Sequence, residues 1–119
     1  NMKSFLLRVF IVSLVFVTAQ VSAETSLPKD VQRLLADREA CDHWRGEEPY
    51  DAERRAAIDW AVCHSCTGTD AKLAALKKKY RNNAAVMEKL NAQSEKVEPE
   101  DQASTRQFCK STRKPAWMP

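Results

Sequence analysis

Glycine and strand-like patterns are nearly absent from this 119-residue sequence. Its two glycines, Gly46 and Gly68, stand where stretches with helical periodicity stop. Runs in which apolar and polar residues alternate, as they would along a half-buried strand, are almost missing. No internal repeat is visible. The sequence therefore predicts an all-α protein that forms one domain at most.

The sequence also lacks a strong excess of charge of one sign. It has 19 lysines and arginines against 16 aspartates and glutamates, and two of the basic residues, Lys3 and Arg8, lie near the N-terminus. Without these two residues the net charge falls from +3 to +1. A nearly neutral chain has no general electrostatic reason to bind nucleic acid or an acidic membrane. We therefore predict no nucleic-acid partner, and the residues carry no cofactor signature.

One long apolar run is present, and it is too short to span a bilayer. It covers Val9–Ala19, follows a short basic head, and precedes small residues at positions 21–23. A membrane-spanning helix needs about 20 apolar residues, whereas this run has about a dozen. The arrangement is typical of a cleaved secretory signal. We predict a hydrophobic signal helix within residues 1–23 and a mature chain from Glu24. That chain would be periplasmic or secreted and would have no stable membrane anchor.

Four later segments show the apolar spacing of amphipathic helices. They are, approximately, Pro28–Trp44, Ala52–Ser65, Asp70–Arg81 and Ala84–Lys96. Asp51 precedes the second segment and is a favourable N-cap. Thr67, with Asp70 three residues later, resembles a capping box for the third. The sequence thus predicts a small irregular bundle of about four helices over residues 24–98.

The C-terminal part, residues 99–119, is polar and rich in proline. We predict a tail there that is ordered mainly where Phe108 and Cys109 anchor it. Four cysteines in a short exported chain indicate two disulfides, because such chains fold in an oxidising compartment and have small cores.

The apolar stripes favour one of the three possible disulfide pairings. Cys41 continues the inward stripe of the first helix, and Cys66 continues that of the second. Cys63 lies on the flank. We therefore favour Cys41–Cys66 with Cys63–Cys109. A bridge between Cys63 and Cys66 would join adjacent turns of one helix and constrain little.

This pairing has a geometric consequence for the connection between the first two helices. In a tight antiparallel hairpin Cys41 would face about Arg55, and Cys66 lies about 16 Å farther along the second helix. The segment Asp42–Tyr50 must therefore be partly extended and run back along that helix, which its length permits.

The sequence Cys63-His64-Ser65-Cys66 leaves two other interpretations open. It could be a thioredoxin-like redox pair, or it could bind a metal together with Cys41 and His43. The redox interpretation is weakened because the pair falls at the end of a helix, where the dipole does not stabilise a thiolate. The metal interpretation is weakened because exported thiols are usually oxidised. We predict no metal site.

No set of residues forms a recognisable catalytic arrangement. His43 and His64 are the only histidines, and no nucleophile is placed to complete a triad at a strand turn. The carboxylates of the first loop do not have calcium-loop spacing. An enzyme of unknown type therefore stays the last alternative, and no catalytic residue is assigned.

The first loop is the best candidate for a contact with another protein. Aromatic residues and arginine are enriched at protein interfaces, and here they stand beside helix breakers and outside the apolar stripes. The candidate partner-binding residues are Trp44, Arg45, Glu47, Glu48 and Tyr50. We predict a non-enzymatic interaction protein, of inhibitor or immunity type. A redox or metal-binding protein that uses Cys63 and Cys66 is the alternative.

Two strings of this sequence resemble a group of small exported proteobacterial proteins of uncharacterised role. They are CDHWRGEEPYDAERR at residues 41–55 and CTGTDAKLAAL at residues 66–76. The resemblance extends over about Arg38–Leu90 and implies export and a helical domain, but no activity. Cys63 and Cys109 lie outside the shared pattern, as a second bridge would. A looser analogy links the chain to periplasmic helical immunity proteins, which are small, disulfide-bonded and bind a toxin.

Overall fold

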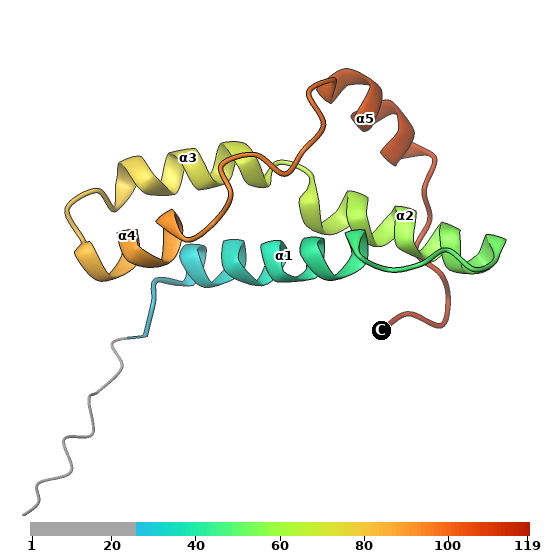
Figure 1. Cartoon of the computed structure of the whole chain (residues 1–119), viewed down its shortest axis with the longest axis horizontal. Coiled ribbons are helices and arrows are strands. Elements are labelled where there is room, and N and C mark those ends of the chain that lie inside the picture. Colours follow the sequence, from blue (N-terminus) through green and yellow to red (C-terminus); the bar gives the residue numbers. More distant parts are fainter. Residues whose placement is uncertain (1–25) are drawn as a thin grey trace, which may run out of the picture.

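The computed structural model describes residues 26–119, so the predicted signal peptide lies outside the described residues. Within that range the chain is helical and contains no strand, which confirms the predicted fold class (Figure 1). The helices are α1 (Lys29–Arg45), α2 (Ala52–Cys66), α3 (Thr69–Lys79), α4 (Ala84–Asn91) and α5 (Gln102–Lys110).

Helix α1 is the element against which the others are arranged. Helix α3 lies along its N-terminal half, α4 lies beside α3 at the N-terminal end of α1, and the C-terminal end of α2 lies over the C-terminal end of α1 (Figure 1). The rest of α2 extends beyond α1, and the segment 46–50 runs beside it (Figure 1). The chain therefore doubles back along α2, as the predicted disulfide required.

Two parts of the C-terminal half differ from the sequence prediction. Helix α4 ends at Asn91 rather than near Lys96, and the predicted tail contains α5. Asp101 begins α5: its carboxylate accepts hydrogen bonds from the Ser104 backbone N–H at 2.9 Å and from the Ser104 hydroxyl at 2.7 Å. The backbone bond from Ser104 is the main reason that the pKa of Asp101 is lowered. This helix was missed because it is short and mostly polar, with Ala103, Phe108 and Cys109 as its apolar residues; none of its residues is buried.

The apolar core lies between α1, α3 and α4. Its buried members are Val31, Leu34, Leu73, Leu76, Val86 and Leu90. These residues recur at helical spacing, so each helix turns one face to the others. The core occupies one half of the molecule, and the other half is held together differently.

The contact between α1 and α2 is made by small side chains and a disulfide. Cys41 and Cys66 are bonded, with a Cα–Cα distance of 5.0 Å, and Ala57 and Ala61 are buried beside them. The larger apolar residues of α2, Ile58 and Val62, are only half-buried, because the short bridge draws the alanine face of α2 onto α1.

Arg38 joins the two halves. Its side chain is buried, with 2% of its surface exposed, and its guanidinium forms an ion pair with Asp70 at 2.8 Å. Its Nε donates to the Thr69 hydroxyl at 2.9 Å, and its Nη1 donates to the Ser94 carbonyl at 2.6 Å. A buried charge is tolerated only when it is paired and hydrogen-bonded, and Arg38 meets both conditions.

The start of α3 corrects the predicted capping box. Gly68 is the N-cap residue, with a left-handed φ of 82°, and no side chain caps the helix from that position. Asp70 instead accepts hydrogen bonds from the backbone N–H groups of Val97 and Glu98, at 2.9 and 3.2 Å. Glu98 in turn accepts from the Asp70 N–H at 2.9 Å. The segment after α4 thus replaces the local cap at the start of α3.

A charged contact between the start of α1 and the end of α3 makes the free energy of unfolding depend on pH. Asp30 accepts hydrogen bonds from Lys79 Nζ at 2.7 Å and from Tyr80 Oη at 2.8 Å. The bond from Lys79, followed by that from Tyr80, lowers the pKa of Asp30 below its ordinary value of 3.8. A group whose pKa is lower in the folded state stabilises the fold above its unfolded pKa and loses that effect as pH falls through the folded pKa.

We expect the stability difference between the native protein and Asp30→Asn to be constant near neutral pH and to shrink as pH falls below about 4. Urea midpoints at a series of pH values between 7 and 2 measure this. The matched variant Asp37→Asn, a change on the same helix outside this contact, should not reproduce the effect. A difference that persists unchanged at pH 2 would contradict the assignment.

Candidate protein-interaction site

An aromatic patch surrounds one arginine of α2. We use this name for Trp44, Tyr50, Arg54 and Trp117. The guanidinium carbon of Arg54 lies 5.2 Å from the ring centre of Trp44 and 5.8 Å from that of Tyr50. Both distances fall within the range of cation–π contacts. The extended segment 46–50 makes this possible, because it carries Tyr50 along α2 to the level of Arg54.

Glu47 compensates the charge of this arginine. Arg54 Nη2 lies 2.6 Å from Glu47 Oε2, and His43 Nε2 lies 3.4 Å from the other carboxylate oxygen. Asp51, the N-cap of α2, accepts a hydrogen bond from the Arg54 N–H at 2.7 Å, as its position before the helix predicted. Among the described residues, Arg54 Nε is buried without an acceptor. The rings of Trp44 and Tyr50 and the carboxylate of Glu47 nevertheless hold the guanidinium group from several sides.

The structure separates the five predicted partner-binding residues. It brings Trp44, Glu47 and Tyr50 together around Arg54. Arg45 points away from them: it pairs with Asp42 at 2.6 Å and donates a long hydrogen bond of 3.5 Å to the Val97 carbonyl. Glu48 is exposed, and its backbone carbonyl accepts the Tyr50 N–H at 3.1 Å.

Arg54 and Trp117 were not among the residues predicted from the sequence to form the site. Trp117, from the C-terminal segment, and Tyr50 border a hollow of about 250 Å³ whose other lining residues are Asp51, Glu53 and Arg54. Tyr50 is 78% exposed and Trp117 is 53% exposed. A tryptophan in a polar tail was a usable signal, because such a large apolar side chain is uncommon in a segment that only meets water.

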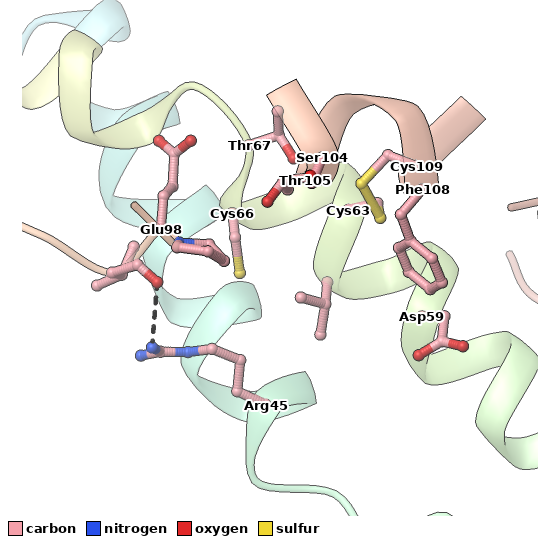
Figure 2. Close-up of a pocket in the computed structure, with 13 residues that line it drawn as sticks. Arg45, Asp59, Cys63, Cys66, Thr67, Glu98, Ser104, Thr105, Phe108 and Cys109 are labelled. Atoms are coloured by element: carbon pink, nitrogen blue, oxygen red, sulfur yellow. Dashed lines mark hydrogen bonds between the residues drawn. A yellow bond between two sulfur atoms is a disulfide. The ribbon is translucent and has the colours of Figure 1, made fainter. Parts of the chain in front are cut away.

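A second cavity of about 420 Å³ lies between α2, α5 and the segment before α5 (Figure 2). Its walls are mainly apolar and include the Cys63–Cys109 bridge and Phe108 (Figure 2). Arg45, Asp59 and Glu98 contribute its charged groups. Helix α5 thus stands slightly away from α2 and is connected to it by a covalent bond.

The four cysteines form the bridges Cys41–Cys66 and Cys63–Cys109, the pairing favoured from the sequence. No cysteine in the part of the chain that the structure describes is free. Cys63 and Cys66 belong to different bridges, so they do not form the disulfide of a thioredoxin-like pair. Two disulfides indicate an oxidising compartment outside the cytosol.

The histidines are engaged in local contacts. His43 lies beside Glu47, and His64 stacks on Trp60 with ring centres 4.7 Å apart. Within residues 26–119, no group of three or more histidine, cysteine, aspartate or glutamate side chains is arranged to hold a metal ion. Across the same residues, every helix is too short or too polar to cross a bilayer.

No family model, curated protein or solved structure matches the chain.

Proposed function

We propose that this chain is an exported, non-enzymatic protein that acts by binding another protein through its aromatic patch. The observation that carries this proposal is the exposure of Tyr50 and Trp117 side by side around one hollow. Aromatic side chains and arginine are the residues most enriched among those that dominate binding energy at interfaces. Neither aromatic residue belongs to the apolar core.

The rest of the fold suits such a role. Two disulfides and the buried Arg38 network hold a short chain in one shape, and a preformed surface loses less entropy on binding than a flexible one. We propose an inhibitor or immunity-type binder, exported by the signal at residues 1–23 and located in the periplasm or outside the cell. The resemblance to small exported proteobacterial proteins supports the location.

Site-specific photo-crosslinking tests this proposal. A benzophenone amino acid is placed at Tyr50, at Trp117 or, as a control, at the exposed Lys78 on α3, and the full chain is exported from a bacterial host of the kind the resemblance indicates. We expect one defined protein adduct at positions 50 and 117 and none at position 78. The intact mass of the same material should show a chain that begins at Glu24.

The stability of the variants provides the necessary control. Because Tyr50 and Trp117 are exposed, Tyr50→Ala and Trp117→Ala should each change the free energy of unfolding by no more than about 0.5 kcal/mol. Each should also reduce the adduct formed from the other position. Equal adducts at all three positions, or none at 50 and 117, would contradict the proposed surface.

A further inference from the structure

We infer that the hollow bordered by Tyr50 and Trp117 receives a cationic side chain, an arginine or a lysine, of the partner protein. The inference rests on the proposed function and specifies the chemistry of the partner. We call this site the aromatic hollow; it is lined by Tyr50, Asp51, Glu53, Arg54 and Trp117. Its volume of about 250 Å³ lies below that of ordinary small-molecule pockets, and it suits a single side chain.

The charges that line the hollow leave an excess of negative charge. The cation Arg54 is already paired with Glu47, at 2.6 Å. Among residues 26–119, neither Asp51 nor Glu53 forms an ion pair. One oxygen of Asp51 accepts the backbone N–H of Arg54 and so caps α2. A partner that fills the hollow therefore meets two carboxylates that form no ion pair with another described residue.

The chemistry of the walls discriminates between possible occupants. A purely apolar side chain would bury these carboxylates without a partner, which is costly. An anionic side chain would be repelled. A cation gains both from the carboxylates and from the ring faces, since tyrosine and tryptophan attract a cation within about 6 Å of the ring centre.

One of the two aromatic side chains of the hollow, Tyr50, already contacts a cation within this chain. Arg54 lies within cation–π distance of Trp44 and Tyr50, and farther along α2 Lys114 lies 5.6 Å from the ring centre of Trp60. Tyr50 remains 78% exposed despite its contact with Arg54. Most of its surface, and about half of that of Trp117, is therefore available to a second cation from outside.

Titration of the full, oxidised chain with blocked peptides tests the inference. The probe is acetyl-(Gly-Arg)3-amide, and the matched controls replace arginine by the uncharged isostere citrulline or by glutamate. The readout is the NMR signal of the Trp117 indole N–H. We expect a saturable shift with the arginine peptide that weakens as salt is added, and little or none with the other two.

Variants of the hollow give the second part of the test. Glu53→Gln and Trp117→Ala should each weaken binding of the arginine peptide by about 2–5-fold, as expected for one exposed cation–π or ionic contact. Affinity for the Trp117→Ala variant is followed through backbone amide signals of residues 50–54. Glu88→Gln, which removes an exposed carboxylate from α4 at the other end of the molecule, should have no effect.

Three outcomes would overturn the inference: no saturable shift, equal binding of the citrulline peptide, or equal weakening by Glu88→Gln. If crosslinking at positions 50 and 117 succeeds while the arginine peptide fails, the proposed function stands and the partner has a different chemistry. If the peptide binds as expected and no crosslink forms, the hollow takes cations but the proposed function fails.

Discussion

Replacement of Arg38 by alanine is expected to lower the free energy of unfolding by about 3–5 kcal/mol, the range measured when one member of a buried ion pair is removed. Arg38 donates to Thr69 and Asp70 at the start of α3 and to Ser94 in the segment after α4. The alanine variant leaves all three acceptors facing a cavity. Urea unfolding with intact disulfides, followed by circular dichroism, measures the loss.

Two further variants separate charge from geometry. Arg38→Lys keeps a positive charge but lacks the planar fork that serves several acceptors at once, so it should recover only part of the stability. Arg33→Ala removes an exposed arginine from the same helix and should cost no more than about 0.5 kcal/mol. A loss below about 1 kcal/mol for Arg38→Ala would show that the network contributes little.

The two disulfides are expected to differ in what their removal releases. Cys41 and Cys66 are buried at the α1–α2 contact, so the double variant Cys41→Ser/Cys66→Ser should unfold at a lower temperature as a whole. The chain-entropy model gives about 3.5 kcal/mol for this loop, whose cysteines are 25 positions apart. Removal of Cys63–Cys109 should instead free α5 and the C-terminal segment while α1–α4 stay folded.

Loop length alone would predict that removal of Cys63–Cys109 destabilises the protein more than removal of Cys41–Cys66. Cys63 and Cys109 are 46 positions apart, and in the chain-entropy model the bridge that closes the longer loop stabilises slightly more. However, α5 has no buried residue and can detach without opening the core, which limits the loss. Limited proteolysis with mass spectrometry should show early cleavage within residues 99–119 of Cys63→Ser/Cys109→Ser. A larger drop in melting temperature for this variant than for Cys41→Ser/Cys66→Ser would contradict the assignment.

Local patterns were sufficient where one element settles its own structure. The apolar spacing located α1 to α3 to within about two residues, and Asp51 was recognised as the cap of α2. The position of cysteines on or beside the stripes was enough to favour the observed bridges. The partners of Arg38 were not predicted. They lie 31, 32 and 56 positions away along the chain, beyond the reach of periodicity.

The candidate site also combines residues that local patterns identify with residues that only the fold brings together. Trp44 and Tyr50 were found because they stand beside helix breakers and outside the stripes. Trp117 and Arg54 were not among the predicted residues, and Arg45 lies apart from Trp44 and Tyr50, because only the path of the chain decides which of these side chains meet. The Cys63–Cys109 bridge and the segment after α5 bring Trp117 back to the start of α2.

The helical class, the favoured pairing of the cysteines and the doubled-back connection could be predicted from the sequence, since each follows from spacing along the chain and from the length of an extended segment. The end of α4, the cap of α3 and the set of aromatic residues that share one surface depend on contacts between distant segments. In each of these cases a hydrogen bond or contact from a distant segment competes with the local one. Asp70 shows the reason. Its carboxylate accepts hydrogen bonds from the backbone N–H groups of Val97 and Glu98, and not from the Thr67 N–H as in a capping box, because folding brings the distant segment within reach.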